Sequence, residues 1–244
     1  MQEKINFKSD YIQYAKSVQY WLPMDTEELY QYNLKHNRHL LEEHKWIDAE
    51  IKYEFNSYGF RCDEFSSDPT AMFLGCSFTC GIGLPKQMIW PEILSQHLGL
   101  RCANLGIGGG SPDTAFRLCL GHIELIKPKI LFYLEPPEGR VELVSDIESI
   151  NITASCDNND KNIANFYKLW IQGGYHNVKL NALKNALSIQ KLCDKIDIPC
   201  YILSMVDFLK LDLARDLVHG GAFSHASFAN KIFDRIKKDL QSFA

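Results

Sequence analysis

A serine that directly follows an apolar strand is the residue of this chain best suited to nucleophilic chemistry. Ser77 comes after the apolar run from Ala71 to Leu74, and 139 positions beyond Ser77 the segment from Asp216 to His219 supplies a carboxylate and an imidazole. A neutral imidazole can take a serine proton near neutral pH, while the carboxylate holds its tautomer and stabilises the imidazolium. Nearby glycines permit tight turns around the serine: Gly75, Gly81 and Gly83.

Each part of this set also has a plainer interpretation. A serine after a strand commonly caps a helix, and Asp/His pairs three residues apart occur by chance in unrelated proteins. Taken together, Ser77, His219 and Asp216 predict the nucleophile, the general base and the orienting carboxylate of an acyl transfer.

A second feature is the glycine-rich run from Asn104 to Gly110. A tight turn there can aim backbone N–H groups at the oxyanion that develops when a serine attacks a carbonyl. Two other interpretations stay open. A dinucleotide-binding loop would require the spacing Gly-x-Gly-x-x-Gly, which these glycines do not fit, and a purely structural turn would also account for the run.

Apolar runs alternate with helical patterns from residue 71 onward, which is typical of β-α-β crossovers and a parallel sheet. The sequence therefore predicts an α/β fold. Its strands are expected at Ala71 to Cys76, Cys102 to Leu105, Ile130 to Leu134 and Pro199 to Met205.

Capping residues and apolar periodicity predict the helices. Ser111, Pro112 and Asp113 favour a helix start, and the apolar pattern that follows ends before Pro128. Another apolar stripe predicts a helix from Ala222 to about Leu240. Residues 1–66, with helical stretches from Thr26 to Trp46, are predicted to form an extension that packs on a domain of residues 67–244.

The composition excludes several classes of function. The 244 residues suit one large α/β domain, and a net charge of −4 gives no electrostatic reason to expect nucleic acid or an anionic membrane as a partner. The eight cysteines contain no Cys-x-x-Cys pair, which argues against a zinc ribbon or a thioredoxin-type site. The start of the chain lacks a secretory pattern and no run of about 18 apolar residues occurs, so a cytoplasmic protein is expected.

Three segments resemble the sequence blocks of the SGNH (GDSL-type) hydrolases. Gly75 to Thr79, with the glycines that follow, looks like the first block, and Asn104 to Gly110 looks like the second. Asp216 to His225 looks like the last block, which has Asp-x-x-His and a second histidine six residues on. The blocks keep the family's order over about residues 70–240. A weaker resemblance covers Phe55 to Arg61, which is similar to a segment preceding the domain in some members.

The resemblance implies a three-layer α/β/α flavodoxin-like fold with a mainly parallel sheet and no metal or organic cofactor. Members of the family are mostly esterases, lipases, thioesterases and carbohydrate deacetylases. Matching the second block residue by residue assigns its oxyanion N–H group to Gly109.

Two blocks depart from the family pattern. Cys76 stands where the family usually has Asp, next to the serine. The third block of the family carries an asparagine whose side chain is an oxyanion donor, whereas here Leu134 is followed by Glu135-Pro136-Pro137-Glu138-Gly139-Arg140. Losing one such donor costs roughly 10²–10³ in rate. Three substitutes are possible: Glu138 held protonated in a dry pocket, Arg140 as a cationic donor, or an oxyanion hole formed by Ser77 and Gly109 N–H groups alone.

Other candidate residues have mainly structural interpretations. His225 is expected to be a packing or helix-start residue rather than a second base, and His97, His122 and His176 lack metal-ligand spacing. Cys76 and Cys80 flank Ser77, so a thiol nucleophile is an alternative to an inert buried thiol. An aromatic cluster after the polar stretch of residues 157–161 is compatible with a lid, a sugar-stacking surface or a subunit contact: Phe166, Tyr167, Trp170 and Tyr175.

These features predict a serine esterase that acts through an acyl-serine intermediate, with a small acyl group on a carbohydrate as the preferred substrate. A catalytically degenerate protein that binds a glycan or an ester is one alternative, motivated by the altered third block. An O-acyltransferase that uses the same serine is another. The expected partner is a small-molecule or carbohydrate ester, and the sequence leaves the oligomeric state open.

Overall fold

The computed structural model of the chain describes residues 6–145, 148–153, 161–173 and 175–242. The helices are α1 (Glu27–His36), α2 (Arg38–Glu43), α3 (Ser77–Cys80), α4 (Trp90–Leu98), α5 (Pro112–Ile126), α6 (Lys161–Gln172), α7 (Tyr175–Lys195) and α8 (Ala222–Ser242). The strands are β1 (Val18–Gln19), β2 (Tyr53–Glu54), β3 (Thr70–Leu74), β4 (Arg101–Asn104), β5 (Ile130–Leu134), β6 (Val141–Val144), β7 (Ser149–Ile152) and β8 (Cys200–Leu203). Short 3-10 turns lie at Ile12–Tyr14, Lys86–Met88 and Met205–Asp207.

Four parallel strands form the central sheet in the order β4-β3-β5-β8. Every residue of β3 and β5 is buried, which explains why both read as continuous apolar runs. All the predicted strands are present, with ends shifted by at most two residues. The predicted α/β class with a mainly parallel sheet is confirmed.

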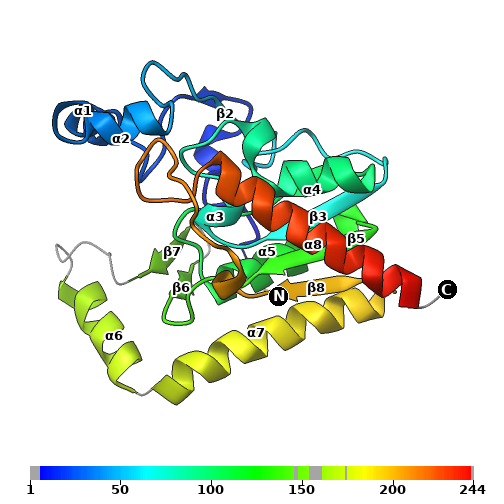
Figure 1. Cartoon of the computed structure of the whole chain (residues 1–244). Coiled ribbons are helices and arrows are strands. Elements are labelled where there is room, and N and C mark those ends of the chain that lie inside the picture. The colour runs from blue at the N-terminus through cyan, green and yellow to red at the C-terminus, as the bar shows by residue number, and fades with distance from the viewer. Residues whose placement is uncertain (1–5, 146–147, 154–160, 174, 243–244) are drawn as a thin grey trace.

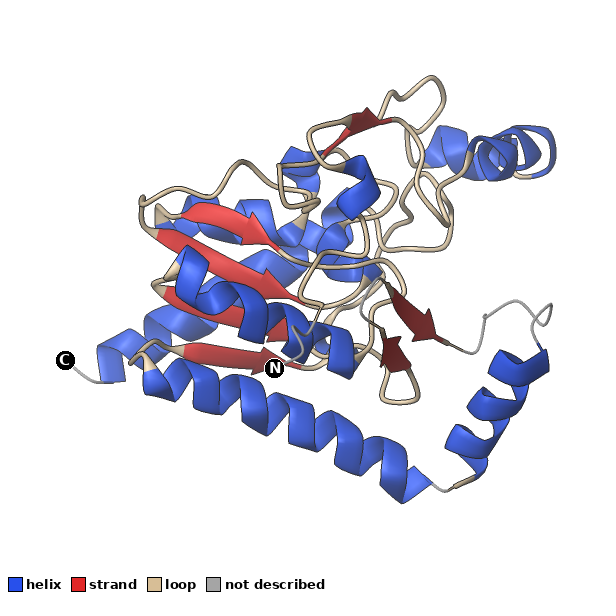
Figure 2. Cartoon of the chain, turned by 180° about the vertical axis from the view of Figure 1, so that it is seen from behind, coloured by secondary structure: helices blue, strands red, loops and turns tan. Residues whose placement is uncertain are grey.

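Helices cover both faces of this sheet (Figures 1 and 2). Ala71 and Phe73 of β3 pack into a core with residues of α4 and α8, whereas Met72 and Leu74 pack on the other side with residues of α5 and α7. The alternation follows from the two-residue period of a strand. The carboxyl ends of the strands meet at one edge of the sheet, where the loops carrying the predicted site begin.

Local signals set the helix ends as the sequence predicts. Ser111 caps α5 by accepting the N–H of Thr114 at 3.1 Å, and the helix ends at Ile126, with Lys127 as its C-cap just before Pro128. The predicted last helix is present as α8. The helical stretch expected from Thr26 to Trp46 is divided into α1 and α2, with Thr26 as the cap of α1. The division of the chain at residue 66 stays a prediction.

The β6–β7 hairpin follows the third-block segment, and the sequence did not predict it. The hairpin is joined to α5 by a buried ion pair between Arg117 and Glu142, whose atoms lie 2.7 and 2.8 Å apart. Arg117 also donates to Asp10, 2.7 Å away, so the pair links the N-terminal segment, here residues 6–66, to the hairpin. Thr114 donates to Glu142 as well, at 3.0 Å, and these bonds hold the hairpin beside the start of α5.

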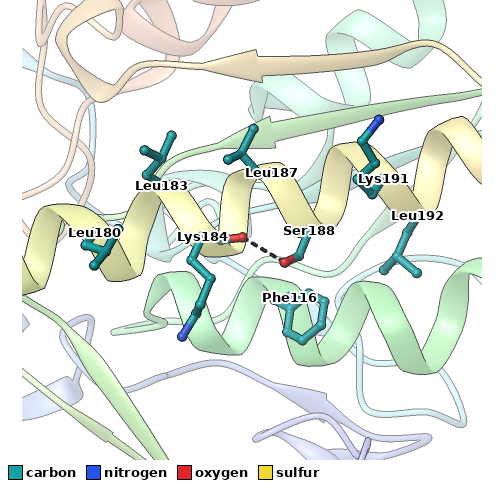
Figure 3. A pocket seen from close by; sticks show the side chains of 8 residues that line it. All are labelled: Phe116, Leu180, Leu183, Lys184, Leu187, Ser188, Lys191 and Leu192. Carbon is teal, nitrogen blue, oxygen red and sulfur yellow. Dashed lines mark hydrogen bonds between the residues drawn. The ribbon is translucent and has the colours of Figure 1, made fainter.

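The outer face of α7 carries three exposed leucines, Leu180, Leu183 and Leu187. They line a shallow hollow of about 570 Å³ between α7 and α5, together with Phe116 and the aliphatic part of Lys184 (Figure 3). None of the lining residues belongs to the loops that carry Ser77, Gly109 or His219. Among the described residues, no helix combines the length and the apolar character needed to cross a membrane.

Removing the charge of Glu142 is expected to destabilise the fold. The variant Glu142→Gln leaves the buried Arg117 guanidinium with a weaker set of acceptors, and breaking a buried pair typically costs about 3–5 kcal/mol. Urea unfolding followed by circular dichroism measures the change. Glu124→Gln on the exposed side of α5 is the matched control, with an expected change within about 0.5 kcal/mol. Equal unfolding midpoints for the two variants would contradict the role of this pair.

Candidate active site

Ser77 is the first residue of α3, which follows β3 after a sharp turn at Gly75 and Cys76. Gly75 adopts a φ of +153°, and a Cβ there would lie 2.3 Å from Thr79 Oγ1 and 2.9 Å from the Leu134 carbonyl oxygen. Only glycine fits this turn without displacing its neighbours. Ser77 is 2% exposed, so its hydroxyl is largely shielded from bulk solvent.

His219 lies directly against Ser77, although 142 residues separate them in the chain. The distance from His219 Nε2 to Ser77 Oγ is 2.8 Å, and His219 Nδ1 contacts Asp216 Oδ2. The other carboxylate oxygen accepts the backbone N–H groups of Val218 and His219, each at 3.0 Å. When Nδ1–H donates to this fixed carboxylate, the Nε2 lone pair is available to accept the Ser77 O–H. The geometry therefore suits proton transfer from Ser77.

The glycine-rich loop leads from β4 to α5 beside the serine turn. Ile107 N–H donates to the Gly75 carbonyl at 3.1 Å, and Asn104 Nδ2 donates to the Thr79 carbonyl at 2.8 Å. Gly109 has a φ of +75° and is partly exposed. Among the described residues, the N–H groups of Gly109 and Ser77 have no hydrogen-bond acceptor. Both donors are therefore available to a ligand.

The third-block segment places Arg140, and not Glu138, against the glycine-rich loop. Arg140 Nη1 donates to the Gly110 carbonyl at 3.2 Å, and no carboxylate of the described residues pairs with this guanidinium. Glu138 is exposed, so the alternative in which a dry pocket keeps it protonated is wrong. Glu135 is half-buried, and burial, followed by the charge of Glu138, raises its pKa.

Helix α6 approaches the same turn, where Trp170 Nε1 donates to the Gly139 carbonyl at 3.1 Å. The aromatic side chains of the predicted cluster therefore include one in contact with the third-block segment. Whether α6 acts as a lid stays a prediction. The preceding stretch of residues 157–161 lies, apart from Lys161, outside the described residues, as does the side chain of Tyr175.

The neighbouring cysteines do not have the surroundings of nucleophiles. Cys76 and Cys80 are completely buried, and burial raises the pKa of the Cys80 thiol to about 11. A buried thiol of high pKa carries little thiolate at neutral pH. The Ser77 hydroxyl, in contrast, is hydrogen-bonded to the imidazole of His219.

The histidines with structural interpretations have backbone or amide partners. His225 Nδ1 accepts the N–H of Trp90 at 3.0 Å, which joins the start of α4 to α8. His122 Nδ1 lies 3.0 Å from the Leu118 carbonyl, and His97 Nε2 lies 3.0 Å from Asn230 Oδ1. For His176 the structure gives only that it has an interaction partner.

Two buried polar residues from the N-terminal segment reach these loops, and no motif indicated the first of them. Tyr11 Oη accepts the N–H of Gly108 at 2.9 Å. The Arg61 guanidinium donates to the carbonyls that follow the serine helix, those of Cys80 at 3.0 Å and Gly81 at 2.6 Å. Arg61 belongs to the segment that weakly resembles the family, which is the one signal that pointed to it.

Comparison with known proteins leaves the family open. No protein-family profile and no curated protein matches the chain. Among solved structures, a lipolytic protein of the G-D-S-L family from Desulfitobacterium hafniense is 11% identical at a TM-score of 0.37, over 68% of this chain and 98% of that one. The esterase EstA from Pseudoalteromonas is 13% identical at 0.38, over 71% and 100%. A carbohydrate esterase family 2 enzyme from Corynascus thermopiles is 12% identical at 0.41, over 73% and 68%. At such values the likeness carries no argument about function, which rests on the geometry of the loops.

His225 is expected to make the stability of the protein fall in mild acid. Burial, followed by the nearby His219, lowers the pKa of His225 to about 3, whereas an unfolded histidine titrates near 6.5. The unfolded state therefore binds a proton first, and stability falls as the pH drops from about 6.5 towards 3, by up to about 1.4 kcal/mol per pH unit. Urea unfolding between pH 7.5 and 4.5 should show this slope in the wild type and a shallower one in His225→Asn, which keeps an acceptor near Nδ1. Parallel pH profiles would contradict the assignment.

Proposed function

We propose that the protein hydrolyses carboxylic esters through an acyl-serine intermediate, in the manner of the SGNH hydrolases that its sequence blocks resemble. The observation that carries the proposal is the continuous contact from Ser77 Oγ through His219 to the Asp216 carboxylate, with all three side chains buried. Acyl transfer to a serine requires at least that its hydroxyl be hydrogen-bonded to a correctly oriented imidazole.

The proposed reaction has two halves. His219 Nε2 takes the proton of Ser77 as Oγ attacks the ester carbonyl, and the imidazolium then protonates the departing alcohol. In the second half a water molecule gives its proton to His219 and attacks the acyl carbon, so the acid leaves and Ser77 recovers its proton. Asp216 holds the neutral imidazole in one tautomer and stabilises the imidazolium, and the free N–H groups of Ser77 and Gly109 donate hydrogen bonds to the oxyanion.

Arg140 is proposed as the third oxyanion donor in place of the family's asparagine. An arginine has five N–H donors and stays protonated, and one hydrogen bond to Gly110 holds its guanidinium beside the loop of Gly109. Glu138 is exposed, and a carboxylate at that place could only accept hydrogen bonds and would oppose the developing charge. The position of Arg140 supports this assignment over the other two substitutes.

The preferred substrate is a small acyl group, such as acetyl, on a carbohydrate. Trp170 supports this preference because its ring lies beside the Gly139–Arg140 turn, where an aromatic surface can stack on a sugar. Transfer of the acyl group to a sugar hydroxyl would use the same intermediate. Release of alcohol and acid in equal amounts, unaffected by added sugars, would identify a hydrolase, whereas consumption of alcohol acceptors would identify a transferase.

Replacing Ser77 by alanine is expected to abolish the reaction. The wild type should hydrolyse short-chain nitrophenyl esters and form a covalent adduct with a fluorophosphonate probe, and Ser77→Ala should do neither. Cys76→Ala is the control for the neighbouring thiol, and it should keep the label on Ser77 when the labelled peptide is located by mass spectrometry. A wild type that neither turns over nor labels would favour the ester-binding or glycan-binding alternative. Loss of labelling in Cys76→Ala alone would move the nucleophile to sulfur.

Replacing Arg140 should slow the chemical step without weakening substrate binding. Removal of an oxyanion donor typically lowers kcat by about 10²–10³ with little change in KM, and this is the expected result for Arg140→Met, whose side chain has no N–H donor. Steady-state kinetics with a nitrophenyl ester measure both constants. Arg235→Met, on the exposed side of α8, is the matched control. A large loss in Glu138→Gln with no loss in Arg140→Met would assign the role to Glu138 instead.

A further inference from the structure

Four residues from three distant parts of the chain close a ring of hydrogen bonds beside the serine site. Gly83 N–H donates to Tyr53 Oη at 2.8 Å, and Tyr53 O–H donates to Asp25 Oδ2 at 2.5 Å. Asp25 accepts two bonds from the Arg215 guanidinium, at 2.7 and 3.1 Å. The backbone N–H of Arg215 donates to the Gly83 carbonyl at 3.1 Å, which closes the ring. We call these residues the hydrogen-bond ring: Gly83, Tyr53, Asp25 and Arg215.

Two members of the ring belong to the loops that carry the proposed nucleophile and base. Gly83 ends the turn after α3, and the N–H groups of the two residues before it donate to the Ser77 carbonyl at 2.8 and 3.2 Å. Arg215 directly precedes Asp216. The two loops also touch, since a Cβ on Gly83 would lie 2.8 Å from Ala214 Cβ. Movement of one loop relative to the other therefore has to break a bond of the ring.

The ring is buried and fully paired, which makes it rigid. Asp25 is 1% exposed, Arg215 3% and Tyr53 0%. Arg215 also donates to the carbonyls of Tyr20 at 2.9 Å and Ala49 at 3.2 Å. Because few waters can replace these partners, each bond lost from the ring leaves a buried polar group unsatisfied.

We propose that Asp25 and Tyr53 are positioning residues for the reaction: through the hydrogen-bond ring they set the separation of Ser77 from His219. The inference rests on the proposed function. It makes the N-terminal segment a part of the reactive geometry and not only a covering layer. A displacement of about 1 Å between reacting groups can cost about 10²-fold in rate, so loosening the ring is expected to act on the chemical step.

A second tyrosine provides a matched control for a merely structural effect. Tyr30 Oη also accepts one backbone N–H, that of Asp48 at 3.2 Å, and donates to one carbonyl, that of Trp46 at 3.3 Å. Its hydroxyl bonds stay within the N-terminal segment. Its aromatic ring lies 5.7 Å from the Arg215 guanidinium, and this contact is retained in Tyr30→Phe. Each of the two variants, Tyr53→Phe and Tyr30→Phe, thus deletes one hydroxyl group and two hydrogen bonds. The bonds lost in Tyr53→Phe belong to the hydrogen-bond ring, and those lost in Tyr30→Phe do not.

The experiment compares these two variants with the wild type. In Tyr53→Phe we expect the second-order rate of fluorophosphonate labelling and kcat for a nitrophenyl ester to fall about 10- to 100-fold with little change in KM. Tyr30→Phe should keep the wild-type values. Equal losses in both variants, or wild-type rates in a folded Tyr53→Phe, would overturn the proposal. Circular dichroism establishes that each variant is folded.

A second readout does not depend on turnover. The His219 Nδ1 proton, hydrogen-bonded to a carboxylate, gives a far-downfield proton resonance that His219→Gln identifies by its loss. Tyr53→Phe should shift or broaden this resonance, and Tyr30→Phe should leave it in place. If the wild type neither labels nor turns over, the proposed function fails while this comparison still tests the ring. Should Tyr53→Phe not fold, Asp25→Asn, which keeps the acceptor shape, replaces it, and an unchanged resonance in that variant would overturn the proposal.

Discussion

The hydrogen bond between Ser77 and His219 is the contact on which the rest of the structure depends, because its two ends belong to loops 142 residues apart. One loop leaves the fully buried strand β3, and the other precedes α8, which packs on the same face of the sheet as α4. The sheet sets the approximate position of both loops, and no strand connects them directly. The final separation of Ser77 from His219 is therefore set by side-chain and backbone hydrogen bonds that bridge the two loops. The groups that make these bonds come largely from residues before the central sheet.

Sequence reasoning reached the elements whose signals are local. β3 and β5 are buried on both faces and so appear in the sequence as unbroken apolar runs. The bounds of α5 are indicated by residues at its own ends, which are a capping serine with a proline at the start and another proline just beyond the end. The pairing of Asp216 with His219 is also local. The contacts of Tyr11, Asp25 and Tyr53 with the site are not, because each joins residues 30 to 190 positions apart and leaves no periodicity in the sequence. The orientation of the third-block segment could not be predicted for a similar reason. The hairpin that follows it is held by Arg117 and Asp10, which are distant in the sequence.

Buried arginines are the common means by which the N-terminal segment contacts the rest of the chain. Arg61 donates only to carbonyls, Arg117 binds two carboxylates, and Arg215 binds one carboxylate and two carbonyls. A guanidinium can satisfy several acceptors in fixed directions, which suits the joining of loops that have no regular structure. Such charges are costly to bury, so they stabilise the arrangement only while every partner is in place. The site is consequently sensitive to changes well outside its own motifs.

The contact between Asp25 and Arg215, 190 residues apart, has a consequence for how the protein acquires its structure. Contacts between distant parts of a chain carry a large loop-closure cost and form late, after local helices and neighbouring strands. During synthesis, Asp25 stays without its cation until Arg215 has emerged, long after the parallel strands β3, β4 and β5 are complete. Helices and neighbouring strands can therefore form before the Ser77 and His219 loops reach their final separation, which waits for the N-terminal segment to dock.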